Sequence, residues 1–570
     1  MGAMRAFLLG VLLAAAAPAD GELSEDVALL KVPPPVQANS LAPNVSAGPG
    51  GVYLSWVEVV PKGYALKISR FDGLQWSAAK SVVSGRRIVV NEADAPALAA
   101  FGDGSLVVQW MEPSSKARDA MTLLVARSPD GGKTWEAPVA VSQDAAPGER
   151  GFVSFLETGK GKFSTVWLDG TGALDANGAA VETKMQVSPF ANGAFGAPVT
   201  ADSRVCDCCQ TASAMTDAGQ LVVYRDRGET EGRDISYLLL EKGKESAGWP
   251  KPKQVSPDGW KTPACPVNGP AVAANGNAVA TAWFTAADQQ PKVKIAFSTD
   301  GGRTFGGAIR VDQGRPAGRV DVAWLAGGWA LVSWIERGDG ESVSLKASWA
   351  KPDGALGEPI RIAELGKGSA DAYPRMARKG ADVFFTWTEG GEKPRVEVVR
   401  MRGLNHKTPR FEPLAKKDEY GAKAKAHPAE TWVNQPAKPF SAVTIEGGRV
   451  SLEDYKGKVV LLTFFGTWCP PCRAEVPSVV ALHKRLDAKN FSVIAVNAGD
   501  DKGTVKAFAA KNGMQYPIVQ DQGQTDLYGV TGYPTNVVID RKGTVRYRES
   551  GYSPQSMAKM SKLIDTLLAE

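Results

Sequence analysis

The chain has 570 residues, of which 44% are hydrophobic and 22% are charged, as in ordinary globular proteins. Its 66 basic and 61 acidic residues leave a net charge of +5, which gives no reason to expect binding to nucleic acid or to a membrane surface. A chain of this length is too long for one hydrophobic core, so several domain equivalents are expected.

Residues 1–19 have the pattern of a secretory signal peptide. Arg5 precedes an apolar run over residues 6–17 that is too short to span a bilayer, and Ala17-Pro18-Ala19 fits a cleavage site with small residues. The alternative is a buried N-terminal helix. We therefore expect an exported chain in the periplasm or another extracytoplasmic compartment, which is oxidising towards cysteine.

Seven repeats follow between residues 22 and 404. Each contains a hydrophobic run that ends in an aromatic residue, usually with an acid two positions later. Further short apolar segments give four expected strands in most repeats, which is typical of a β-propeller blade. The seventh repeat shows only three, and residues 26–32 are expected to supply its fourth strand and close the ring. Six blades are the alternative. The repeating aromatics are Trp56, Trp110, Trp167, Tyr224, Trp283, Trp334 and Trp387.

Two turns, at residues 128–135 and 298–305, share the pattern Ser-x-Asp-x-Gly-x-Thr-aromatic. They resemble the Asp-box, or BNR repeat, of sialidase-like propellers. This resemblance implies that the Asp and Thr side chains hydrogen-bond their own turn, so the boxes are structural. A sialidase-like glycosidase also needs a tyrosine nucleophile and an arginine triad. No such triad can be assigned, and Tyr224 stands at the repeating aromatic position, so this function ranks last.

Residues 405–436 lose the repeat and are rich in Lys, Ala and Pro, as expected of an interdomain linker. From residue 437 to 570 short apolar runs alternate with helical patterns, which predicts an α/β domain. Strands are expected near 459–466, 491–498 and 536–543, and helices near 471–489, 502–512 and 554–568.

The first expected strand of this domain leads into WCPPC, from Trp468 to Cys472. A C-x-x-C pair at a strand-to-helix turn is a strong redox signal, because the free N–H groups of the helix stabilise the attacking Cys469 thiolate. Cys472, one turn into the helix, then resolves the mixed disulfide, and the pair requires no cofactor. Half of a zinc site and a structural disulfide are the alternatives. They lack support from a second C-x-x-C or a pair of histidines in this domain.

The C-terminal domain resembles the TlpA/ResA class of thioredoxin-like extracytoplasmic thiol–disulfide oxidoreductases. The matching segments are LEDYKGKVVLLTFFG (452–466), WCPPCRAEVP (468–477) and GVTGYPTNVVIDRKG (529–543). The resemblance implies that this class is mostly reductive and receives electrons from a membrane thiol transporter of the DsbD/CcdA type. The expected substrate is a protein thiol or disulfide.

The same resemblance implies roles for single residues. Pro534 is expected to be a cis-proline that faces the disulfide, with Tyr533 just before it, where backbone groups are free to pair with an extended substrate. The buried acid of ordinary thioredoxins would fall at Thr463, which carries no carboxylate. Glu475 instead matches the acidic residue of the ResA-like pattern and is expected to exchange protons with Cys472. The alternative for Glu475 is an ordinary carboxylate on the face of a helix.

The remaining four cysteines lie in the propeller. Cys206 lies 18 residues before Tyr224 and Cys265 lies 18 residues before Trp283, so the two occupy equivalent positions in adjacent blades. Cys208 and Cys209 lead into the innermost strand of the first of these blades. All four cysteines are therefore expected near one mouth of the central channel.

Three interpretations of these four cysteines are open. The first is two disulfides, Cys206–Cys265 and a vicinal Cys208–Cys209 bridge. The second is a thiolate site for Cu(I) or Zn, because no histidine occurs between residues 22 and 404. The third is an unpaired redox relay.

Two functional hypotheses follow. In the first, the protein is an exported thiol–disulfide oxidoreductase whose propeller presents or binds a cysteine-rich or metal-linked substrate, and the redox domain reduces the propeller cysteines or a docked partner. In the second, it is a periplasmic copper-handling protein whose Cu(I)-thiolate site is maintained by its own thioredoxin-like domain.

Overall fold

The computed structural model describes residues 27–570 except for 115–120, 143–147, 172–181, 339–341, 367–371, 392, 403–431, 487, 489 and 501. The predicted signal peptide (1–19) and most of the predicted linker (405–436) therefore lie outside the described residues. Among the helices of the described residues, none is long and apolar enough to cross a membrane.

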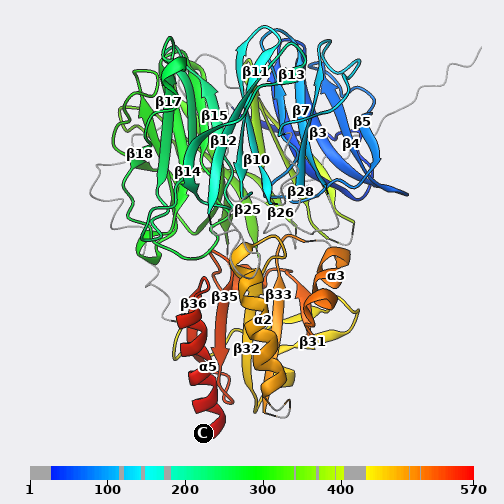
Figure 1. Ribbon diagram of the computed structural model, residues 1–570, viewed down its shortest axis with the longest axis vertical. Coiled ribbons are helices and arrows are strands. Elements are labelled where there is room, and N and C mark those ends of the chain that lie inside the picture. The colour runs from blue at the N-terminus through cyan, green and yellow to red at the C-terminus, as the bar shows by residue number, and fades with distance from the viewer. Residues whose placement is uncertain are drawn as a thin grey trace, which may run out of the picture.

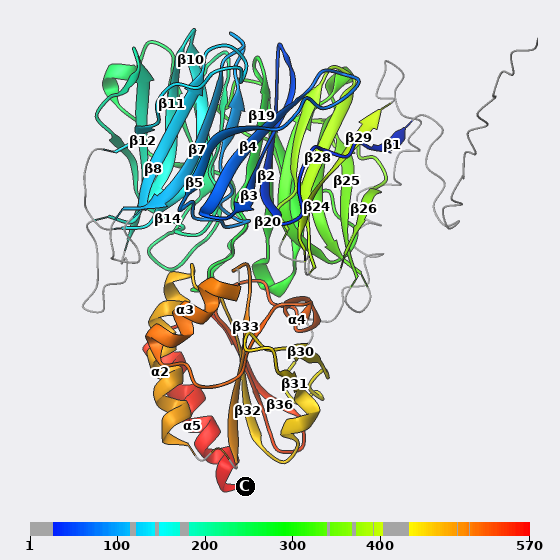
Figure 2. The same cartoon turned by 90° about the vertical axis from the view of Figure 1, so that its right-hand side faces the viewer.

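Seven antiparallel sheets form a ring and make up the upper body in Figures 1 and 2. Consecutive strands pair within each sheet, as in a propeller. The first four blades contain β2 (Ser40–Gly48), β3 (Gly51–Val60), β4 (Gly63–Phe71) and β5 (Lys80–Arg86); β6 (Leu98–Ala100), β7 (Leu106–Pro113), β8 (Met121–Ser128) and β9 (Val139–Ala140); β10 (Arg150–Gly159), β11 (Lys162–Asp169), β12 (Thr183–Ala191), β13 (Ala194–Phe195) and β14 (Val199–Val205); and β15 (Ala212–Met215), β16 (Gly219–Arg225), β17 (Ile235–Glu241) and β18 (Lys253–Ser256).

The seventh blade closes the ring with the first described strand of the chain. β1 (Ala28–Lys31) pairs antiparallel with β29, with Ala28 opposite Arg402. This pairing confirms seven blades and the predicted origin of the missing strand, and it covers an edge that would otherwise be open. The last three blades contain β19 (Ala271–Asn275), β20 (Ala278–Thr285), β21 (Lys292–Ser298) and β22 (Ile309–Arg310); β23 (Pro316–Trp324), β24 (Ala330–Arg337), β25 (Val343–Ala350) and β26 (Ile360–Leu365); and β27 (Arg375–Lys379), β28 (Asp382–Glu389) and β29 (Arg395–Arg402).

The repeating aromatics are buried in the blades, and the structure explains the acid that follows most of them. In five blades the indole N–H donates to the carboxylate two positions later, at 2.7–3.1 Å. A buried N–H without a partner costs about 1–3 kcal/mol, so the acid is part of the blade core. Trp283 lacks such an acid and donates instead to Asp258 at 2.6 Å. The hydroxyl of Tyr224 donates to Asp202.

The two Asp-box turns bond internally as the resemblance implies. Asp130 accepts from the Ser128 hydroxyl at 2.8 Å and from the Thr134 hydroxyl at 2.6 Å. Asp300 accepts from the Thr304 hydroxyl at 2.6 Å in the second box. These bonds tie the third strand of a blade to its fourth, so the boxes act as turns of the scaffold.

The C-terminal domain lies below the propeller in Figures 1 and 2, and its central sheet has the order β34-β33-β32-β35-β36. β32 is parallel to β33 and antiparallel to β35, which is the mixed sheet of a thioredoxin-like fold. Every residue of β32 and β33 is buried, which explains why both strands were visible as continuous apolar runs. The elements are β30 (Ser441–Val443), β31 (Arg449–Ser451), β32 (Val459–Phe465), α2 (Pro470–Arg485), β33 (Phe491–Asn497), α3 (Lys502–Asn512), β34 (Ile518–Gln520), α4 (Gln524–Leu527), β35 (Thr535–Ile539), β36 (Val545–Ser550) and α5 (Pro554–Ala569).

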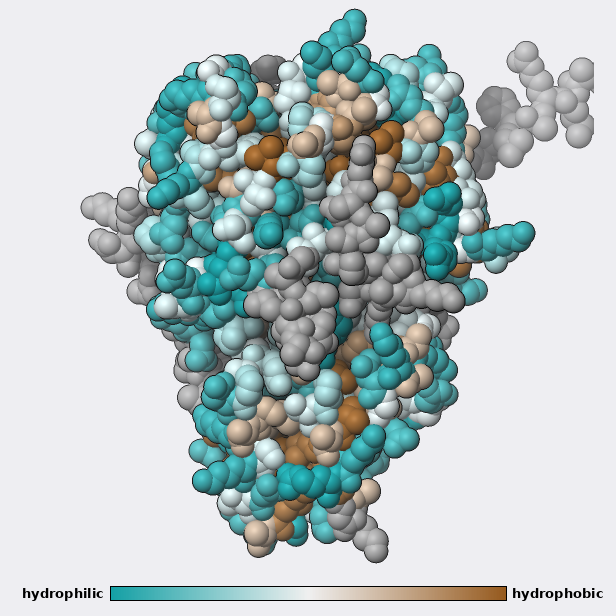
Figure 3. Space-filling view, in the orientation of Figure 1, coloured by the Kyte–Doolittle hydropathy of each residue, from teal (hydrophilic) through white to brown (hydrophobic). Residues whose placement is uncertain are grey.

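The visible face of the molecule in Figure 3 is mostly hydrophilic over the propeller, with smaller hydrophobic areas on both domains. The large apolar side chains that are exposed, such as Leu74 and Val199, are scattered along the chain. Most apolar side chains pack instead between adjacent blades and around the central sheet of the C-terminal domain.

Candidate functional site: two sulfur centres at the domain interface

The WCPPC sequence lies where β32 ends and α2 begins. Cys469 is the N-cap residue of α2, and the backbone N–H of Cys472 donates to its Sγ atom at 3.3 Å. Pro470 and Pro471 fill the first helical positions, where a missing N–H is tolerated because no intrahelical acceptor exists there. A disulfide joins Cys469 and Cys472 in this structure. The helix N-terminus therefore points at the sulfur that the sequence assigns to nucleophilic attack.

Glu475 lies one turn after Cys472 on the same helix and is buried, with 3% of its surface exposed. Burial raises the pKa of this carboxyl to about 8, although the Asn536 amide, which donates to Oε1 at 2.6 Å, opposes the rise. Asn536 is opposite Thr463 in the β32–β35 pairing, so it stands beside the position of the missing thioredoxin acid. Glu475 can therefore hold or release a proton near neutral pH within the dithiol site.

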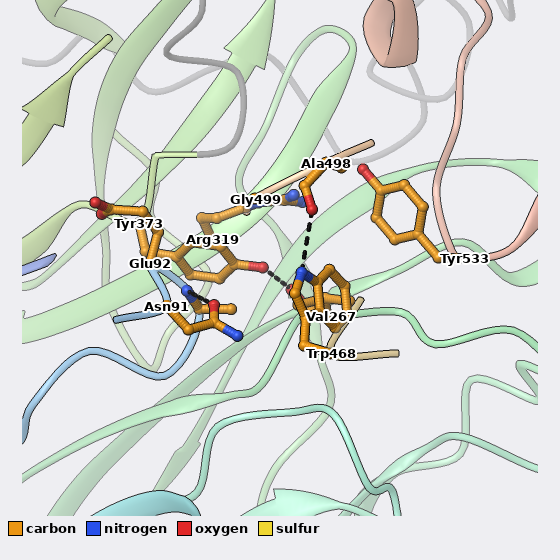
Figure 4. Close-up of a pocket in the computed structure, with 10 residues that line it drawn as sticks. Asn91, Glu92, Val267, Arg319, Tyr373, Trp468, Ala498, Gly499 and Tyr533 are labelled. Carbon is orange, nitrogen blue, oxygen red and sulfur yellow. Dashed lines mark hydrogen bonds between the residues drawn. The ribbon is translucent and has the colours of Figure 1, made fainter. Parts of the chain in front are cut away.

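Trp468 and Tyr533 flank the dithiol from two loops. The indole N–H of Trp468 donates to the carbonyl of Ala498 at 3.1 Å, and its ring meets the Tyr533 ring edge-on with centroids 5.7 Å apart. The Tyr533–Pro534 peptide bond is cis. Figure 4 shows these two side chains from the C-terminal domain beside Tyr373 and Val267 of the propeller, around one shared pocket.

The backbone of Tyr533 pairs with a propeller cysteine. The N–H of Cys265 donates to the Tyr533 carbonyl at 2.8 Å, and the N–H of Tyr533 donates to the Cys265 carbonyl at 3.1 Å. The two bonds make an isolated antiparallel bridge between the domains. The position at which the resemblance expects a substrate backbone is thus taken by residues of the same chain.

Two glycines let the C-terminal domain approach the Cys265 segment closely. A Cβ atom at Gly532 would lie 2.9 Å from the Ala264 Cβ and 3.1 Å from the Cys265 carbonyl oxygen. A Cβ atom at Gly551 would lie 2.5 Å from the Pro263 side chain. Glycine at both positions is therefore a requirement of the contact between the domains.

Polar contacts support the same interface further from the sulfurs. Arg473, on the first turn of α2, forms an ion pair with Glu149 of the propeller. The guanidinium of Arg337 donates to the Val530 carbonyl at 2.9 Å. Cys469 and Cys472 are 0% and 1% exposed in this arrangement, because the propeller covers the end of the redox domain that carries them.

The four propeller cysteines lie close together on the propeller side of this interface. Cys206, Cys208 and Cys209 lie on the connection from β14 to β15, and Cys265 lies on the connection from β18 to β19. The Cys206 Sγ atom is 3.1 Å from that of Cys209 and 3.7 Å from that of Cys208. All four are buried free thiols, and one hydrophobic cluster contains them together with Cys469 and Cys472. The predicted convergence of the four cysteines is confirmed, whereas the predicted Cys206–Cys265 and Cys208–Cys209 bonds are absent.

The four thiols of the cluster differ in pKa because their neighbours differ. Burial raises the pKa of the Cys206 thiol, but its hydrogen bonds with Cys208 and Cys209 and the Arg233 guanidinium outweigh burial and hold that pKa well below its usual value. Burial raises the pKa of Cys265 to about 12, and it also raises the pKa values of Cys208 and Cys209. Cys206 is therefore the sulfur of the cluster that most readily carries a negative charge.

Arg233 and Asp207 are parts of this site that sequence reasoning missed. Arg233 donates to Glu231 at 2.8 Å and to the Thr262 carbonyl at 3.2 Å, while its buried Nη1 has no hydrogen-bond partner among the described residues. Asp207 approaches the Cys265 sulfur to 4.0 Å. The position of Asp207 between two cysteines could have predicted its place in the site. Arg233 lies on the connection between β16 and β17, and the spacing of residues in the sequence does not relate that connection to the cluster.

Tyr224 belongs to the blade core and not to this site. It is 1% exposed, and burial together with the Asp202 and Asp226 carboxylates raises the pKa of its hydroxyl far above the ordinary value. The neighbouring Arg225 donates to the carbonyls of Asn268 and Phe284 at 2.9 and 2.7 Å. Both side chains are thus engaged in holding the blades, as the repeat position of Tyr224 predicts.

Comparison with known proteins relates the C-terminal domain to redox enzymes. Residues 433–548 match the AhpC/TSA family. The thiol–disulfide oxidoreductase ResA of Halalkalibacterium halodurans is 34% identical over 133 residues, which are 23% of this chain and 76% of that protein. ResA of Bacillus thuringiensis is 36% identical over 115 residues, and this chain spans 66% of its length, just under two thirds.

A solved structure gives a similar match. A thiol:disulfide interchange protein of the thioredoxin family from Chlorobium tepidum is 32% identical, with a TM-score of 0.22, and the match covers 24% of this chain and 97% of that one.

Proposed function

We propose, from the premise that this chain belongs through its C-terminal domain to the ResA-type thiol–disulfide oxidoreductases, that the protein is an exported reductase whose substrate is the cysteine cluster of its own propeller. The observation that carries this proposal is the pair of hydrogen bonds between Cys265 and Tyr533, which holds a cysteine-bearing segment at the dithiol. A protein substrate that pairs its backbone with the enzyme presents its sulfur in a defined register.

The proposed reaction uses the residues at the start of α2. The Cys469 thiolate attacks a disulfide of the cluster and forms a mixed disulfide, and Cys472 then attacks Cys469 and releases the substrate thiol. Glu475 takes up the proton that Cys472 must lose, which its pKa of about 8 allows near neutral pH. Trp468 and Tyr533, which line the pocket between the domains, shape the docking surface around the disulfide together with the cis-proline Pro534.

The burial and number of the cluster thiols support the proposed reductive direction. An oxidising compartment converts adjacent thiols to disulfides, so a cluster of four free thiols requires a source of electrons there. We propose a membrane thiol transporter of the DsbD/CcdA type as that source. Because Cys469 is covered by the propeller, the redox domain must move away before such a donor can reach it.

A trapping experiment tests the proposal. Cys472→Ser leaves Cys469 without its resolving partner, so the oxidised full chain should accumulate a disulfide between Cys469 and Cys265. Non-reducing digestion with trypsin and mass spectrometry should find residues 459–473 linked to residues 262–292. The matched control is Cys469→Ser, in which Cys472 alone remains and no such link is expected. A Cys472→Ser chain that forms no disulfide between Cys469 and any propeller cysteine contradicts the proposal.

A second candidate function rests on the three sulfurs that converge around Cys206. The ligand atoms of Cys206, Cys208 and Cys209 all lie within 4.8 Å of one another, and soft thiolates of this kind favour Cu(I). The residues present fit such an ion, because Cys206 favours its thiolate form. In this candidate function the cluster holds Cu(I) and the redox domain keeps its thiols reduced.

Metal binding separates the two candidates. Reduced chain prepared without oxygen is titrated with Cu(I) against a coloured Cu(I) chelator, and the copper-handling function requires about one ion held in preference to the chelator. Cys206→Ser should abolish that binding, with Cys469→Ser as the matched control that retains it. A chain that leaves all copper on the chelator excludes this candidate and leaves the reductase.

A further inference from the structure

The four cluster sulfurs divide into two pairs by distance. Cys206 and Cys209 have their Sγ atoms 3.1 Å apart, the shortest separation recorded within the cluster. Cys265 lies instead with Cys208 and Asp207, whose ligand atoms are all within 4.8 Å of one another, and it does not belong to the three-sulfur group around Cys206. Geometry therefore favours the pairs Cys206–Cys209 and Cys208–Cys265 over the pairing of Cys206 with Cys265.

The first pair has the spacing of a redox motif. Cys206-Asp207-Cys208-Cys209 places two residues between its outer cysteines, as Cys469 and Cys472 have between them. The segment is an irregular turn after β14, so no helix N-terminus stabilises a thiolate there. Hydrogen bonds with Cys208 and Cys209 and the charge of Arg233 act there instead, and the buried Nη1 atom of Arg233 has no hydrogen-bond partner within the described part of the chain.

The second pair connects the first to the redox domain. Cys265 is bonded through its backbone to Tyr533, and Cys208 lines a cavity that Trp468 also lines. Cys208 is 3.7 Å from Cys206, so it touches both pairs. The cluster thus runs from Cys265, which is bonded to Tyr533 of the redox domain, through Cys208 to Cys206 and Cys209.

From this arrangement we infer that Cys206 and Cys209 form a second redox-active dithiol, located in the propeller, which the redox domain reduces through a Cys208–Cys265 disulfide. The inference rests on the proposed reductase function and specifies which sulfur is attacked first. Cys265 receives the attack of Cys469, and the inner dithiol receives its electrons by exchange within the propeller.

The first exchange is a two-electron transfer. The Cys469 thiolate attacks the Cys265 sulfur of the Cys208–Cys265 disulfide, and Cys208 leaves as a thiolate, which takes a proton from the neighbouring Asp207 carboxyl or from water. Cys472 then attacks Cys469 and releases Cys265 as a thiol. The redox domain ends as the Cys469–Cys472 disulfide, and an external dithiol returns it to the reduced form.

The second exchange converts the inner disulfide, Cys206–Cys209, into the outer disulfide, Cys208–Cys265. Cys208 returns its proton to Asp207 or water, and its thiolate attacks the Cys206 sulfur of the Cys206–Cys209 disulfide; Cys209 leaves and takes up the proton that Cys265 loses. Cys265 then attacks Cys208, which restores the Cys208–Cys265 disulfide and releases Cys206 as a thiolate beside Arg233. No electrons enter or leave in this step, and the restored outer disulfide is ready for another reduction by Cys469.

Disulfide mapping of the unaltered full chain tests the pairing. The chain is oxidised with diamide in the presence of a metal chelator, free thiols are blocked at low pH, and the protein is cleaved before aspartate. This cleavage separates Cys206 (residues 202–206) from Cys208 and Cys209 (residues 207–216) and from Cys265 (residues 258–287). We expect one species in which all three peptides are linked. A two-peptide species of 202–206 with 258–287 and an internal disulfide in 207–216 overturns the inference.

Two matched variants then identify the partner of Cys265. Cys206→Ser should retain the link between residues 207–216 and 258–287, because Cys208–Cys265 is untouched. Cys208→Ser should lose every link to residues 258–287 while 202–206 stays joined to 207–216 through Cys209. The reverse behaviour, with the Cys265 link lost in Cys206→Ser and kept in Cys208→Ser, contradicts the assignment.

A reduction experiment tests the route and separates this inference from the proposed function. Oxidised chain receives dithiothreitol in slight excess, and the linked peptides are followed in time. In Cys265→Ser the Cys206–Cys209 disulfide should persist about 100-fold longer than in the unaltered chain, because the intramolecular route is lost. Equal persistence overturns the relay. If the cluster disulfides of the Cys469→Ser variant are reduced as fast as those of the unaltered chain, the proposed reductase function is contradicted. The disulfide pairs found by mapping are not affected by that outcome.

Discussion

Cys469 and Cys206 each begin a C-x-x-C sequence, but the chain stabilises their sulfurs by different means. Cys469 caps a helix, and the backbone N–H of Cys472 in the first helical turn donates to its sulfur. Cys206 lies on an irregular turn between two blades, where hydrogen bonds with Cys208 and Cys209 and the charge of Arg233, from another loop, favour its thiolate. A helix N-terminus is built from residues that follow one another in sequence, whereas the Cys206 site forms only after the blades have assembled.

The largest expected effect concerns proton transfer at the helix-borne site. Glu475→Gln keeps an acceptor for the Asn536 amide but removes the group that takes the proton of Cys472. We expect resolution of the mixed disulfide to slow by about 100-fold near pH 7. Rapid-quench measurement of the Cys469–Cys265 adduct checks this. The slowing should shrink as the pH rises and Cys472 ionises without help, which a merely structural role of Glu475 would not produce.

The same carboxyl makes a prediction for stability. Its pKa is near 4.5 when unfolded and about 8 when folded, so between these values the folded chain binds the additional proton. Folding stability that depends on Glu475 is therefore fully present below pH 4.5 and is lost as the pH rises towards 8, by an amount on the order of a few kcal/mol.

Thermal unfolding of the Glu475→Gln variant checks the sign. Its Tm relative to the unaltered chain should rise between pH 5 and pH 9, because the substituted amide side chain has no charge to bury. Glu453→Gln, at an exposed position of the same domain, is the control and should show no such trend.

The difference between the sites also decides how much could be predicted from sequence. The blades were predictable because an aromatic residue recurs at the same place in each, and in five of the seven its indole bonds an acid two positions later, as Trp334 does with Glu336. The WCPPC dithiol was predictable because its neighbours in space are its neighbours in sequence. Long-range partners were not, since nothing in the chain order relates Asn536 to Glu475 or Arg233 to Cys206. The docking of Tyr533 on Cys265 depends on surfaces of both folded domains.

The contact between the domains gives the next largest effect. Gly532→Val places a side chain where even a Cβ lies 2.9 Å from Ala264, so the redox domain should be held away from the Cys265 segment. We expect reduction of the propeller disulfides to slow by about tenfold or more, because the effective concentration of Cys469 near Cys265 falls. Reduction of a small external disulfide should become faster, because Cys469 is uncovered.

Stopped-flow reduction of the two substrates measures both effects in one protein. Gly448→Ala, in the turn after β30, is the matched control, because its nearest neighbour would be 3.5 Å from a Cβ atom. If Gly532→Val slows both reactions equally, the substitution has damaged the redox domain itself and the comparison of covered and uncovered sites is contradicted.

The positive charge of Arg233, which acts on Cys206 where no helix N-terminus is present, can be removed by substitution. Arg233→Met keeps much of the side-chain volume but takes away the guanidinium, so the pKa of Cys206 should rise. Absorbance of the thiolate in the reduced chain, followed as a function of pH, reports this shift. Arg227→Met, at a neighbouring arginine that also contacts Glu231, is the control and should leave the titration nearly unchanged. An identical titration in both variants would show that the sulfurs alone set the acidity of Cys206.

The smallest effect is expected at the rim of the interface. Glu149→Gln removes the ion pair with Arg473 but leaves both side chains partly exposed to water, which screens the charges. The docked arrangement should lose at most about 1 kcal/mol, which corresponds to a change of about fivefold in its population. Reduction of the propeller disulfides should slow by no more than that factor, and the difference should vanish in high salt because screening removes the pair in the unaltered chain as well. A loss that persists in high salt would instead place Glu149 among the groups that shape the sulfur site, since the cavity beside Cys208 also includes this residue.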